Sequence, residues 1–284
     1  MAKTQDVLES IIDDFKEELK NLRLKSIHKA CNHTTGNPYS GFNRWHLSMM
    51  ANKKGYPTAR YATYKQISAA GGQVKKGERG FPVFFWSHLY KFDGDITVSA
   101  SGETEALKKA QKKNPFLTIG SLKDKKMFMK HFTVFNIAQA EGIEFTYEDS
   151  EPLTIEALCK SASTSNMLPS SVSYYEGESD TLFLDSELDV DTTLPSLIES
   201  TSHESRLNRD VEYLQENLVD HIGAAFLAES LNANEVLLKE ETVERWLEAL
   251  DANPMFLYKS AGLAEKAAKF LIENADTSEK AAAA

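Results

Sequence analysis

Between residues 71 and 86 the chain reads Gly71-Gly72-Gln73-Val74-Lys75-Lys76-Gly77-Glu78-Arg79-Gly80-Phe81-Pro82-Val83-Phe84-Phe85-Trp86. The first half of this stretch is polar and rich in glycine and lysine, which predicts a hairpin. The second half is a run of aromatic residues, which predicts a β-strand. A later alternating run, Phe132-Thr133-Val134-Phe135, predicts another strand. We therefore expect strands to form part of the first half of the protein.

Segments with helical periodicity come before and after these strands in the sequence. Apolar residues recur at steps of three and four between Thr4 and Ala30, which predicts one long amphipathic helix. Residues 99–114 are mostly polar, which predicts a mobile insertion. Three apolar stripes between residues 211 and 272 predict further helices. The expected fold class is α+β: a mixed α/β N-terminal domain followed by a mostly helical domain.

The charge of the chain is divided unevenly between its two halves. The whole chain has a net charge of −10, but residues 1–150 hold 23 Lys and Arg against 16 Asp and Glu. The remaining residues hold 9 basic and 26 acidic side chains. Between Lys20 and Phe135 the imbalance reaches 21 basic residues against 6 acidic ones. A positive field of this size over one domain is typical of a protein that binds a polyanion.

Several protein classes are not expected. No apolar run approaches the ~20 residues of a membrane helix, and the polar start of the chain does not resemble a signal peptide. Cys31 and Cys159 share no short spacing, so we expect reduced thiols in the host-cell cytoplasm, with a structural disulfide as the alternative. No phosphate loop or dinucleotide fingerprint is present, and no cofactor is expected.

The stretch from Arg44 to Trp86 interleaves cations with aromatic rings. Single-stranded DNA exposes both its phosphates and its base faces, so a protein that holds it needs both kinds of side chain. The candidate DNA-binding residues are Arg44, Lys53, Lys54, Tyr56, Arg60, Tyr61, Tyr64, Lys65, Lys75, Lys76 and Arg79. The alternative interpretation is that the rings belong to the core, as expected for Phe84 and Trp86 on one face of a strand.

Several ordered blocks resemble one known family. The blocks are Asn37-Pro38-Tyr39-Ser40-Gly41-Phe42-Asn43, Tyr61-Ala62-Thr63-Tyr64-Lys65-Gln66, Gly71–Gly80, Pro82-Val83-Phe84-Phe85-Trp86 and Val134-Phe135-Asn136-Ile137-Ala138-Gln139. In this order they resemble the N-terminal domain of the ArdC-type antirestriction proteins of plasmids and phages. The resemblance implies that this domain binds single-stranded DNA.

The second half resembles the zincin-like domain of the same family. His203-Glu204-Ser205-Arg206-Leu207-Asn208-Arg209 is similar to the stretch after the family's zinc helix, and the run from Glu216 to Leu227 is similar to its next helix. A zincin needs two histidines four residues apart with a glutamate after the first. Counting back from His203 places Pro195, Ser196 and Glu199 at those positions, and His221 at the downstream glutamate ligand. The resemblance therefore implies a degenerate domain.

One alternative for a metal remains open in this half. Glu199 and His203 are four residues apart, and His221 is available as a third ligand, so a relocated zinc site is conceivable on spacing alone. Such a site would still lack a general base for peptide hydrolysis. The alternative is that His203 lies in a surface turn and that His221 is an ordinary helix residue.

The sequence thus predicts a non-enzymatic single-stranded DNA-binding protein of phage or plasmid origin. The expected domains are an N-terminal helix (1–31), a DNA-binding domain (32–146), a degenerate zincin-like domain (147–276) and a flexible tail (277–284). The expected partner is single-stranded DNA, with phage RNA polymerase or replication proteins as further candidates that the acidic half would contact. Two other functions stay open: antirestriction by binding a host nuclease, and a zinc metallopeptidase with a relocated site.

Overall fold

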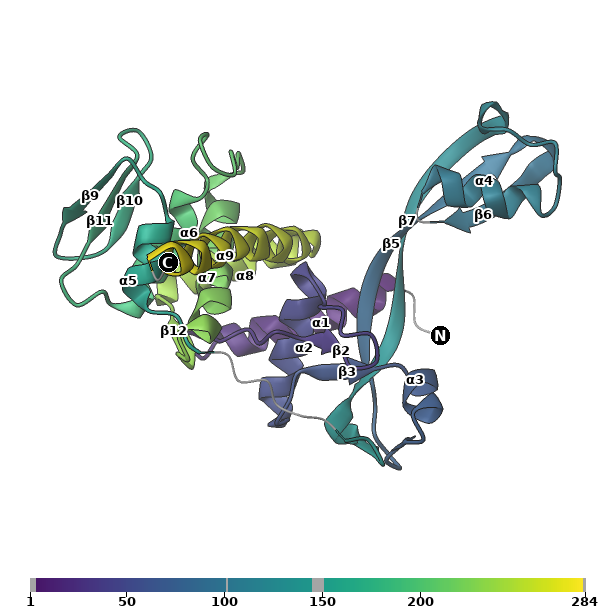
Figure 1. The fold of residues 1–284 in the computed structure, drawn as a ribbon, viewed down its shortest axis with the longest axis horizontal. Coiled ribbons are helices and arrows are strands. Elements are labelled where there is room, and N and C mark those ends of the chain that lie inside the picture. Colours follow the sequence, from purple (N-terminus) through teal and green to yellow (C-terminus); the bar gives the residue numbers. More distant parts are fainter. Residues whose placement is uncertain (1–3, 101, 145–150, 283–284) are drawn as a thin grey trace. The chain divides into compact units, whose positions relative to one another are not determined.

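The computed structural model describes residues 4–100, 102–144 and 151–282, the last seven as backbone alone (Figure 1). The chain forms two compact units. Residues 1–7 and 79–134 make the first unit, and residues 8–78 and 135–284 make the second. Strands and helices are present in both, which confirms the predicted α+β class. No helix in the described ranges is long and apolar enough to cross a membrane.

The first unit is a long antiparallel hairpin with a small helical cap. Strand β5 (Phe81–Phe92) pairs with β7 (Leu122–Asn136), beginning with Phe81 opposite Val134. After the turn η1 (Asp93–Asp95), β6 (Ile96–Ala100) pairs back onto the far end of β5. Helix α4 (Glu103–Gln111) and the turn η2 (Ile119–Ser121) then lead into β7. Figure 1 shows α4 lying against β6 at this end of the hairpin.

The predicted mobile insertion at 99–114 is wrong. This segment contains the end of β6 and all of α4, where Ala106 and Ala110 lie four residues apart and are fully buried. They pack with Tyr90, Phe92 and other residues of a small separate core. The rest of the helix is mostly polar because only this narrow stripe and the partly buried Leu107 pack against the core.

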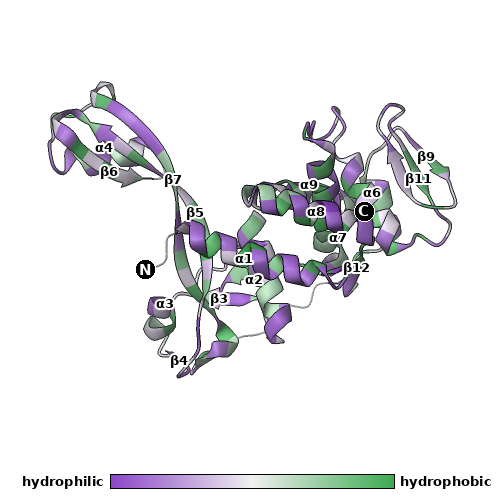
Figure 2. Cartoon of the chain, turned by 180° about the vertical axis from the view of Figure 1, so that it is seen from behind, coloured by the Kyte–Doolittle hydropathy of each residue, from purple (hydrophilic) through white to green (hydrophobic). Residues whose placement is uncertain are grey.

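Helix α1 (Thr4–Leu19), which belongs to the second unit from Leu8 onward, is shorter than the helix predicted over 4–30. Its buried residues follow the predicted stripe, including Ile12, Phe15 and Leu19, and Figure 2 shows hydrophobic and hydrophilic residues in alternating stripes along it. The helix stops because Leu22 takes a left-handed conformation (φ 52°). The chain then enters β1 (Arg23–Lys25), which pairs with β12 (Glu235–Leu237) far along the sequence.

The rest of the N-terminal segment of this unit is built from short elements. They are β2 (Cys31–Asn32), α2 (Gly41–Lys54), β3 (Arg60–Ala62), α3 (Tyr64–Ala69) and β4 (Gln73–Val74). The last residues of β7 pair with β3, Asn136 lying opposite Tyr61. After the turn η3 (Ile137–Gln139), β8 (Ala140–Glu141) pairs with β4. Helix α3 begins with a capping box in which Thr63 and Gln66 satisfy each other's backbone N–H groups.

The helical segment follows residue 150. Its elements are α5 (Ile155–Ser161), α6 (Val190–Ser200), α7 (Tyr213–Ser230), α8 (Glu240–Ala252) and α9 (Met255–Ala282), with a sheet of order β10-β11-β9 made from Tyr174–Glu176, Thr181–Leu184 and Asn166–Pro169. Helices α6 and α7 approach closely at Gly223, where an added Cβ would lie 2.8 Å from Ile198. Helix α9 continues into the stretch predicted as a tail. The predicted boundary at 146/147 lies outside the described residues.

Cys31 and Cys159 are free thiols in the described structure, as the preferred prediction had them. Cys159 is buried, and burial raises the pKa of its thiol to about 11. A thiol with so high a pKa is protonated at neutral pH and is therefore a poor nucleophile.

Candidate nucleic-acid interface

One face of the β5–β7 hairpin carries aromatic and basic side chains that reach solvent. Residues directly opposite each other in an antiparallel pair point to the same face, and Phe85 lies opposite Lys130 while Val83 lies opposite Phe132. We call this side of the hairpin the open face; its members that matter below are Phe85, Leu89, Lys126, Phe128, Lys130 and Phe132. The other side carries Phe84, Tyr90 and Phe92, which are buried, but also Trp86 and Met127, which are 41% and 61% exposed. The expectation that Phe84 and Trp86 are both core residues is therefore right for Phe84 and wrong for Trp86.

The rings of the open face are held in place and remain accessible. Phe85 is 44% exposed and Phe132 is 53% exposed, and their rings meet edge to face with centroids 5.6 Å apart. Lys130 Nζ lies 5.0 Å from the centroid of the Phe128 ring and donates a hydrogen bond to Ser99 Oγ at 2.8 Å. A cation is thereby fixed among aromatic rings, which is the combination that stacks bases and contacts phosphates.

The first unit also carries a surplus of positive charge. Residues 79–134 contain ten Lys and Arg against five Asp and Glu. Several of these lysines make exposed ion pairs, among them Lys125 with Glu103 at 3.3 Å and Lys126 with Asp124 at 3.7 Å. Exposed pairs of this kind contribute at most about 1 kcal/mol. The lysines are therefore able to exchange these carboxylates for phosphates at little cost.

Two of the sequence-predicted DNA-binding residues are not available for that role. Tyr61 is fully buried, and its hydroxyl donates to the carbonyl of Leu47 at 2.6 Å. Burial raises the pKa of this phenol well above its usual value. A ring enclosed in the core has no face on which a base can stack, so the assignment of Tyr61 is corrected.

Arg44 is the second predicted DNA-binding residue that is not available to a ligand. Its guanidinium contacts Glu265 at 3.3 Å, donates to the carbonyls of Ile27 and His28, and lies over the ring of Phe226. Only 14% of the side chain is exposed. Arg44 therefore joins α2 to α9 and the adjoining chain instead of presenting its charge to a ligand. Its basic character in the sequence does not distinguish this buried role from a surface one.

The remaining predicted residues fall into two groups. Tyr56 and Arg60 are half-buried, and the other seven are exposed: Lys53, Lys54, Tyr64, Lys65, Lys75, Lys76 and Arg79. Of these, Arg79 belongs to the first unit and the others to the second. Tyr64, at 57% exposed, is the most accessible of the predicted rings. Lys53 pairs with Asp14 at 2.8 Å and Lys75 donates to the carbonyl of Ala138 at 2.9 Å.

The open face itself was missed. The signal was present as Phe128-Met129-Lys130-His131-Phe132, an alternation that places two phenylalanines and a lysine on one side of a strand. Its partner strand was predicted, but the register brings Phe85 beside Phe132, which is 47 positions further along the chain. Local pattern does not fix such a register.

Helix α6 carries Pro195, Ser196 and Glu199, the residues that the sequence resemblance placed at a zincin's two histidines and general base. Pro195 has no side-chain donor atom, and the hydroxyl of Ser196 donates to the carbonyl of Thr192 at 2.7 Å. Glu199 is mostly buried, and burial raises the pKa of its carboxyl to about 7. These three side chains do not supply the two imidazoles and the general base that zincin chemistry requires.

A guanidinium lies where the second unit gathers its carboxylates. Arg209 forms a bidentate ion pair with Glu216, donates to Thr201 Oγ1 at 2.8 Å and lies 3.7 Å from Asp220. Burial raises the pKa of the Asp220 carboxyl well above its usual range, and the negative charges of Glu216 and Glu199 raise it further. The carboxylates of Glu216 and Asp220 therefore already lie beside a cation, the guanidinium of Arg209.

The relocated metal site considered from the sequence does not form. His203 contacts Ser205 Oγ through Nδ1 at 2.8 Å, within a turn. Nδ1 of His221 contacts the carbonyl of Asn217 one helical turn earlier, at 2.9 Å, and its ring meets Trp246 edge to face. Across the described residues, no group of three His, Cys, Asp or Glu is arranged to hold a metal ion. The residues present therefore do not fit the metal of a zincin.

Comparison with known families agrees with the blocks found in the sequence. Residues 2–135 match the family model for the N-terminal domain of anti-restriction factor ArdC. Residues 2–135 therefore form an ArdC-type N-terminal domain. Two solved structures of the antirestriction ArdC protein from plasmid R388 also resemble the chain over nearly its whole length. The metal-free structure is 23% identical, with a TM-score of 0.70, over 96% of this chain and 98% of that one.

The Mn(II)-bound structure of the same ArdC protein is 24% identical, with a TM-score of 0.67, over 97% of this chain and 98% of that one. At these identities the likeness shows that the ArdC fold extends through the second half of the chain as well.

Curated relatives of the chain include two proteins named DNA primase TraC from Escherichia coli. One is 28% identical over 262 residues and the other 30% identical over 257 residues, covering 85% and 83% of this chain. The chain spans about a quarter or less of the length of these primases (24% and 17%). An uncharacterized protein, y4eC of Sinorhizobium fredii (strain NBRC 101917 / NGR234), is 24% identical over 87% of this chain and 81% of its own length.

Proposed function

We propose that this chain binds single-stranded DNA without reading its sequence, through the open face of the β5–β7 hairpin. The observation that carries the proposal is the pair of half-exposed rings, Phe85 and Phe132, beside a lysine that Ser99 holds in place. The rings offer stacking surfaces for bases, and Lys126 and Lys130 offer charge to the backbone between them.

The chemistry of this face favours single strands over duplex. Stacking of one base on an aromatic ring contributes about 1–3 kcal/mol. In a duplex the base faces are covered by their neighbours, so only the phosphate contacts remain. Because every base has a π-face, a surface made of phenylalanine and lysine does not distinguish one sequence from another.

We also propose that the chain is not a peptidase. Support comes from the side chains of helix α6, because Pro195 and Ser196 stand where a zincin has a histidine and a glutamate. Arg209 adds to this support, because its guanidinium already neutralises Glu216. A water molecule at this place would have neither a metal to lower its pKa nor a base to take its proton.

The ArdC-type N-terminal domain favours a second function, antirestriction by binding a host nuclease. The acidic second half, with 26 Asp and Glu against 9 Lys and Arg after residue 150, suits a contact with a basic protein. The same surface suits a phage RNA polymerase or a replication protein, and the name DNA primase carried by two relatives favours a role on DNA. We place single-stranded DNA first because a specific constellation of side chains supports it.

The test is an equilibrium titration of the full chain against labelled single- and double-stranded oligonucleotides by fluorescence anisotropy. The variant Phe85→Ala with Phe132→Ala is expected to lose most of its preference for single strands. The matched control is Tyr213→Ala, which removes a ring that is 76% exposed in the second unit. Equal affinity for duplex and single strands, or equal losses in both variants, would contradict the proposal.

A further inference from the structure

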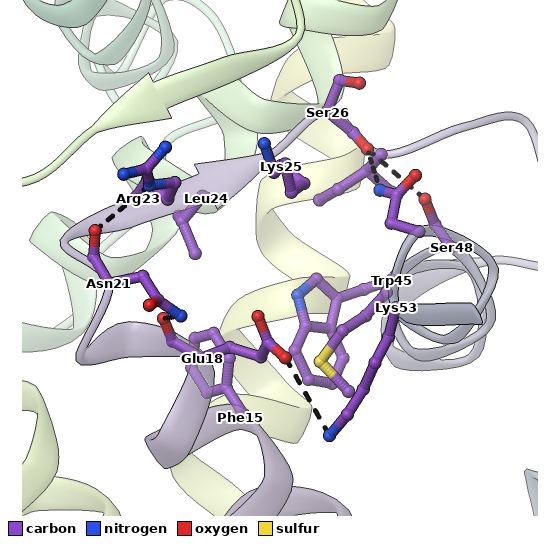
Figure 3. Close-up of a pocket in the computed structure, with 13 residues that line it drawn as sticks. Phe15, Glu18, Asn21, Arg23, Leu24, Lys25, Ser26, Trp45, Ser48 and Lys53 are labelled. Carbon is purple, nitrogen blue, oxygen red and sulfur yellow. Dashed lines mark hydrogen bonds and ion pairs between the residues drawn. The ribbon is translucent and has the colours of Figure 1, made fainter. Parts of the chain in front are cut away.

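A cavity of about 310 Å³ lies within the second unit, between the end of α1, strand β1 and helix α2 (Figure 3). Its apolar walls are Phe15, Leu24, Ile27 and Trp45. Phe15 and Trp45 meet edge to face with centroids 4.9 Å apart, so the two rings brace each other. A volume near the lower end of the range for ligand pockets, about 300–1,000 Å³, fits one ring system better than a long chain.

The polar groups around the cavity include both a donor and acceptors. Figure 3 shows the indole nitrogen of Trp45 turned toward the cavity, with no bond to any of the residues drawn. The side-chain nitrogen of Asn21 donates to the carbonyl of Glu18 at 3.2 Å, which leaves its oxygen as an acceptor. The carboxylate of Glu18 is a further acceptor on the same wall. A ligand that satisfies them needs an acceptor and a donor on its own edge.

The charges at the mouth are already balanced. Arg23 and Lys25 both pair with Glu235. Lys53 pairs with Asp14 at 2.8 Å and lies 3.9 Å from Glu18. Three cations therefore face three carboxylates, and a strongly charged ligand would have to displace one of them. The cavity thus favours a neutral ligand body.

We infer that this cavity binds a neutral heteroaromatic base of the nucleobase class. Such a ring is flat and apolar on its faces, so it fits against Phe15 and Trp45, and its edge carries both acceptors and donors. A purely apolar side chain from a protein partner would fill the space but would leave the indole N–H without a partner, which is unfavourable. The base has two sources, a free nucleoside or one nucleotide of a DNA strand. The inference does not depend on the open face of the hairpin.

The experiment titrates thymidine and deoxyadenosine into the full chain, with nitrogen-15 in its tryptophan side chains. The Nε1–H resonance of Trp45 is identified by its absence in Trp45→Phe. It is expected to shift saturably, with a Kd at or below about 1 mM. The resonance of Trp246, whose Nε1 already donates to Asn217, is expected to stay in place. No saturable shift of the Trp45 resonance would overturn the inference.

Two variants locate the ligand, both measured by calorimetry. Trp45→Phe keeps a ring but removes the donor, and is expected to weaken nucleoside binding about fivefold. Leu24→Phe places a ring in the cavity and is expected to weaken it at least about tenfold. The matched control is Leu207→Phe, the same exchange at an exposed position, which is expected to bind as the parent does. Unchanged binding by Leu24→Phe in a folded protein would also overturn the inference.

A last titration identifies the source of the base. Oligo(dT) is added to the protein already saturated with thymidine. Displacement of thymidine from Trp45 assigns the cavity to a nucleotide of the strand, and simultaneous binding assigns it to a free nucleoside. If oligonucleotides do not bind at all while thymidine does, the proposed function fails and the cavity inference stands.

Discussion

Phe85 and Phe132 touch edge to face although the strand register does not pair them. Phe85 lies opposite Lys130 and Phe132 lies opposite Val83, so the two rings are diagonal neighbours on one face of the sheet. Diagonal side chains of this size reach each other across antiparallel strands. The contact fixes the orientation of both rings while half of each stays exposed. A surface that is already ordered loses less conformational entropy when a strand binds it.

The first prediction separates stacking from charge on the open face. Phe132→Ala is expected to weaken single-stranded DNA binding by about 1–3 kcal/mol and to leave the salt dependence nearly unchanged, because stacking releases few counterions. Lys126→Ala is expected to lower the slope of log affinity against log salt by about 0.7. Titrations at four salt concentrations measure both. A change of slope in Phe132→Ala larger than that in Lys126→Ala would refute this division of roles.

The second prediction concerns the corrected residue Tyr61. Tyr61→Phe removes a buried hydrogen bond to the Leu47 carbonyl, which lies inside α2 and keeps its helical partner. Unfolding should therefore become easier by about 0.5–1.5 kcal/mol. DNA affinity should not change once the protein is folded. Chemical denaturation and anisotropy measure the two quantities. The exposed ring of Tyr64 provides the comparison: Tyr64→Phe is expected to leave stability within about 0.5 kcal/mol of the parent.

The fold was more predictable from sequence than the interface. The stripe through Ile12, Phe15 and Leu19 and the strand at Phe81 follow local periodicity, which the sequence carries directly. The end of α1 at Leu19, followed by the left-handed Leu22, was not predicted, because apolar residues continue at helical spacing through Ile27 while the backbone turns to pair with β12. That pairing joins residues more than two hundred positions apart, and no local pattern encodes it.

The sequence also did not predict which of the candidate side chains are buried. Arg44 and Tyr61 stand among exposed cations and rings in the sequence, yet both face inward because α2 and β3 pack against later segments. The absence of a zincin motif, by contrast, was visible directly, since the resemblance places Pro195, Ser196 and Glu199 at its positions. The ion pair between Arg209 and Glu216 was not visible, because it forms only once α6 and α7 lie side by side.

The third prediction is a pH dependence of stability in the second unit. The pKa of Glu199 is raised from 4.5 to about 7 in the folded protein, mainly by burial. Its protonated form is therefore favoured by folding, so this contribution to stability is full below about pH 4.5 and is lost as the pH rises through 7. Asp220, whose pKa is also raised, acts in the same direction. Glu199→Gln should reduce the difference in unfolding free energy between pH 5 and pH 8 by about 1–3 kcal/mol.

Urea unfolding at pH 5, 6, 7 and 8 measures this effect. The matched control is Glu244→Gln on the exposed surface of α8, which should follow the parent at every pH. Greater stability of the parent at pH 8 than at pH 5, with the difference abolished in Glu199→Gln, would show that the sign of the Glu199 contribution is wrong.

The fourth prediction concerns the buried ion pair between Arg206 and Asp180. The two side chains form two hydrogen bonds, and Tyr175 and Ser165 donate to the same carboxylate. The guanidinium holds the pKa of the Asp180 carboxyl well below its usual range. This contribution is therefore present above the unfolded pKa near 4 and is lost as the pH falls toward the folded value. Asp180→Asn should destabilise the protein by about 3–5 kcal/mol, because it leaves a buried guanidinium without a counter-ion.

The last prediction is that the purified chain retains neither zinc nor manganese in stoichiometric amount and hydrolyses no peptide bond. A catalytic zinc needs three protein ligands and an open position for water. Pro195 supplies no ligand atom, and His203 and His221 each engage a neighbour in their own turn or helix. Elemental analysis after dialysis against a weak chelator tests the metal, and a casein assay with added metal tests the hydrolysis. One metal ion per chain, lost in His203→Ala or His221→Ala, would overturn this account of the second half.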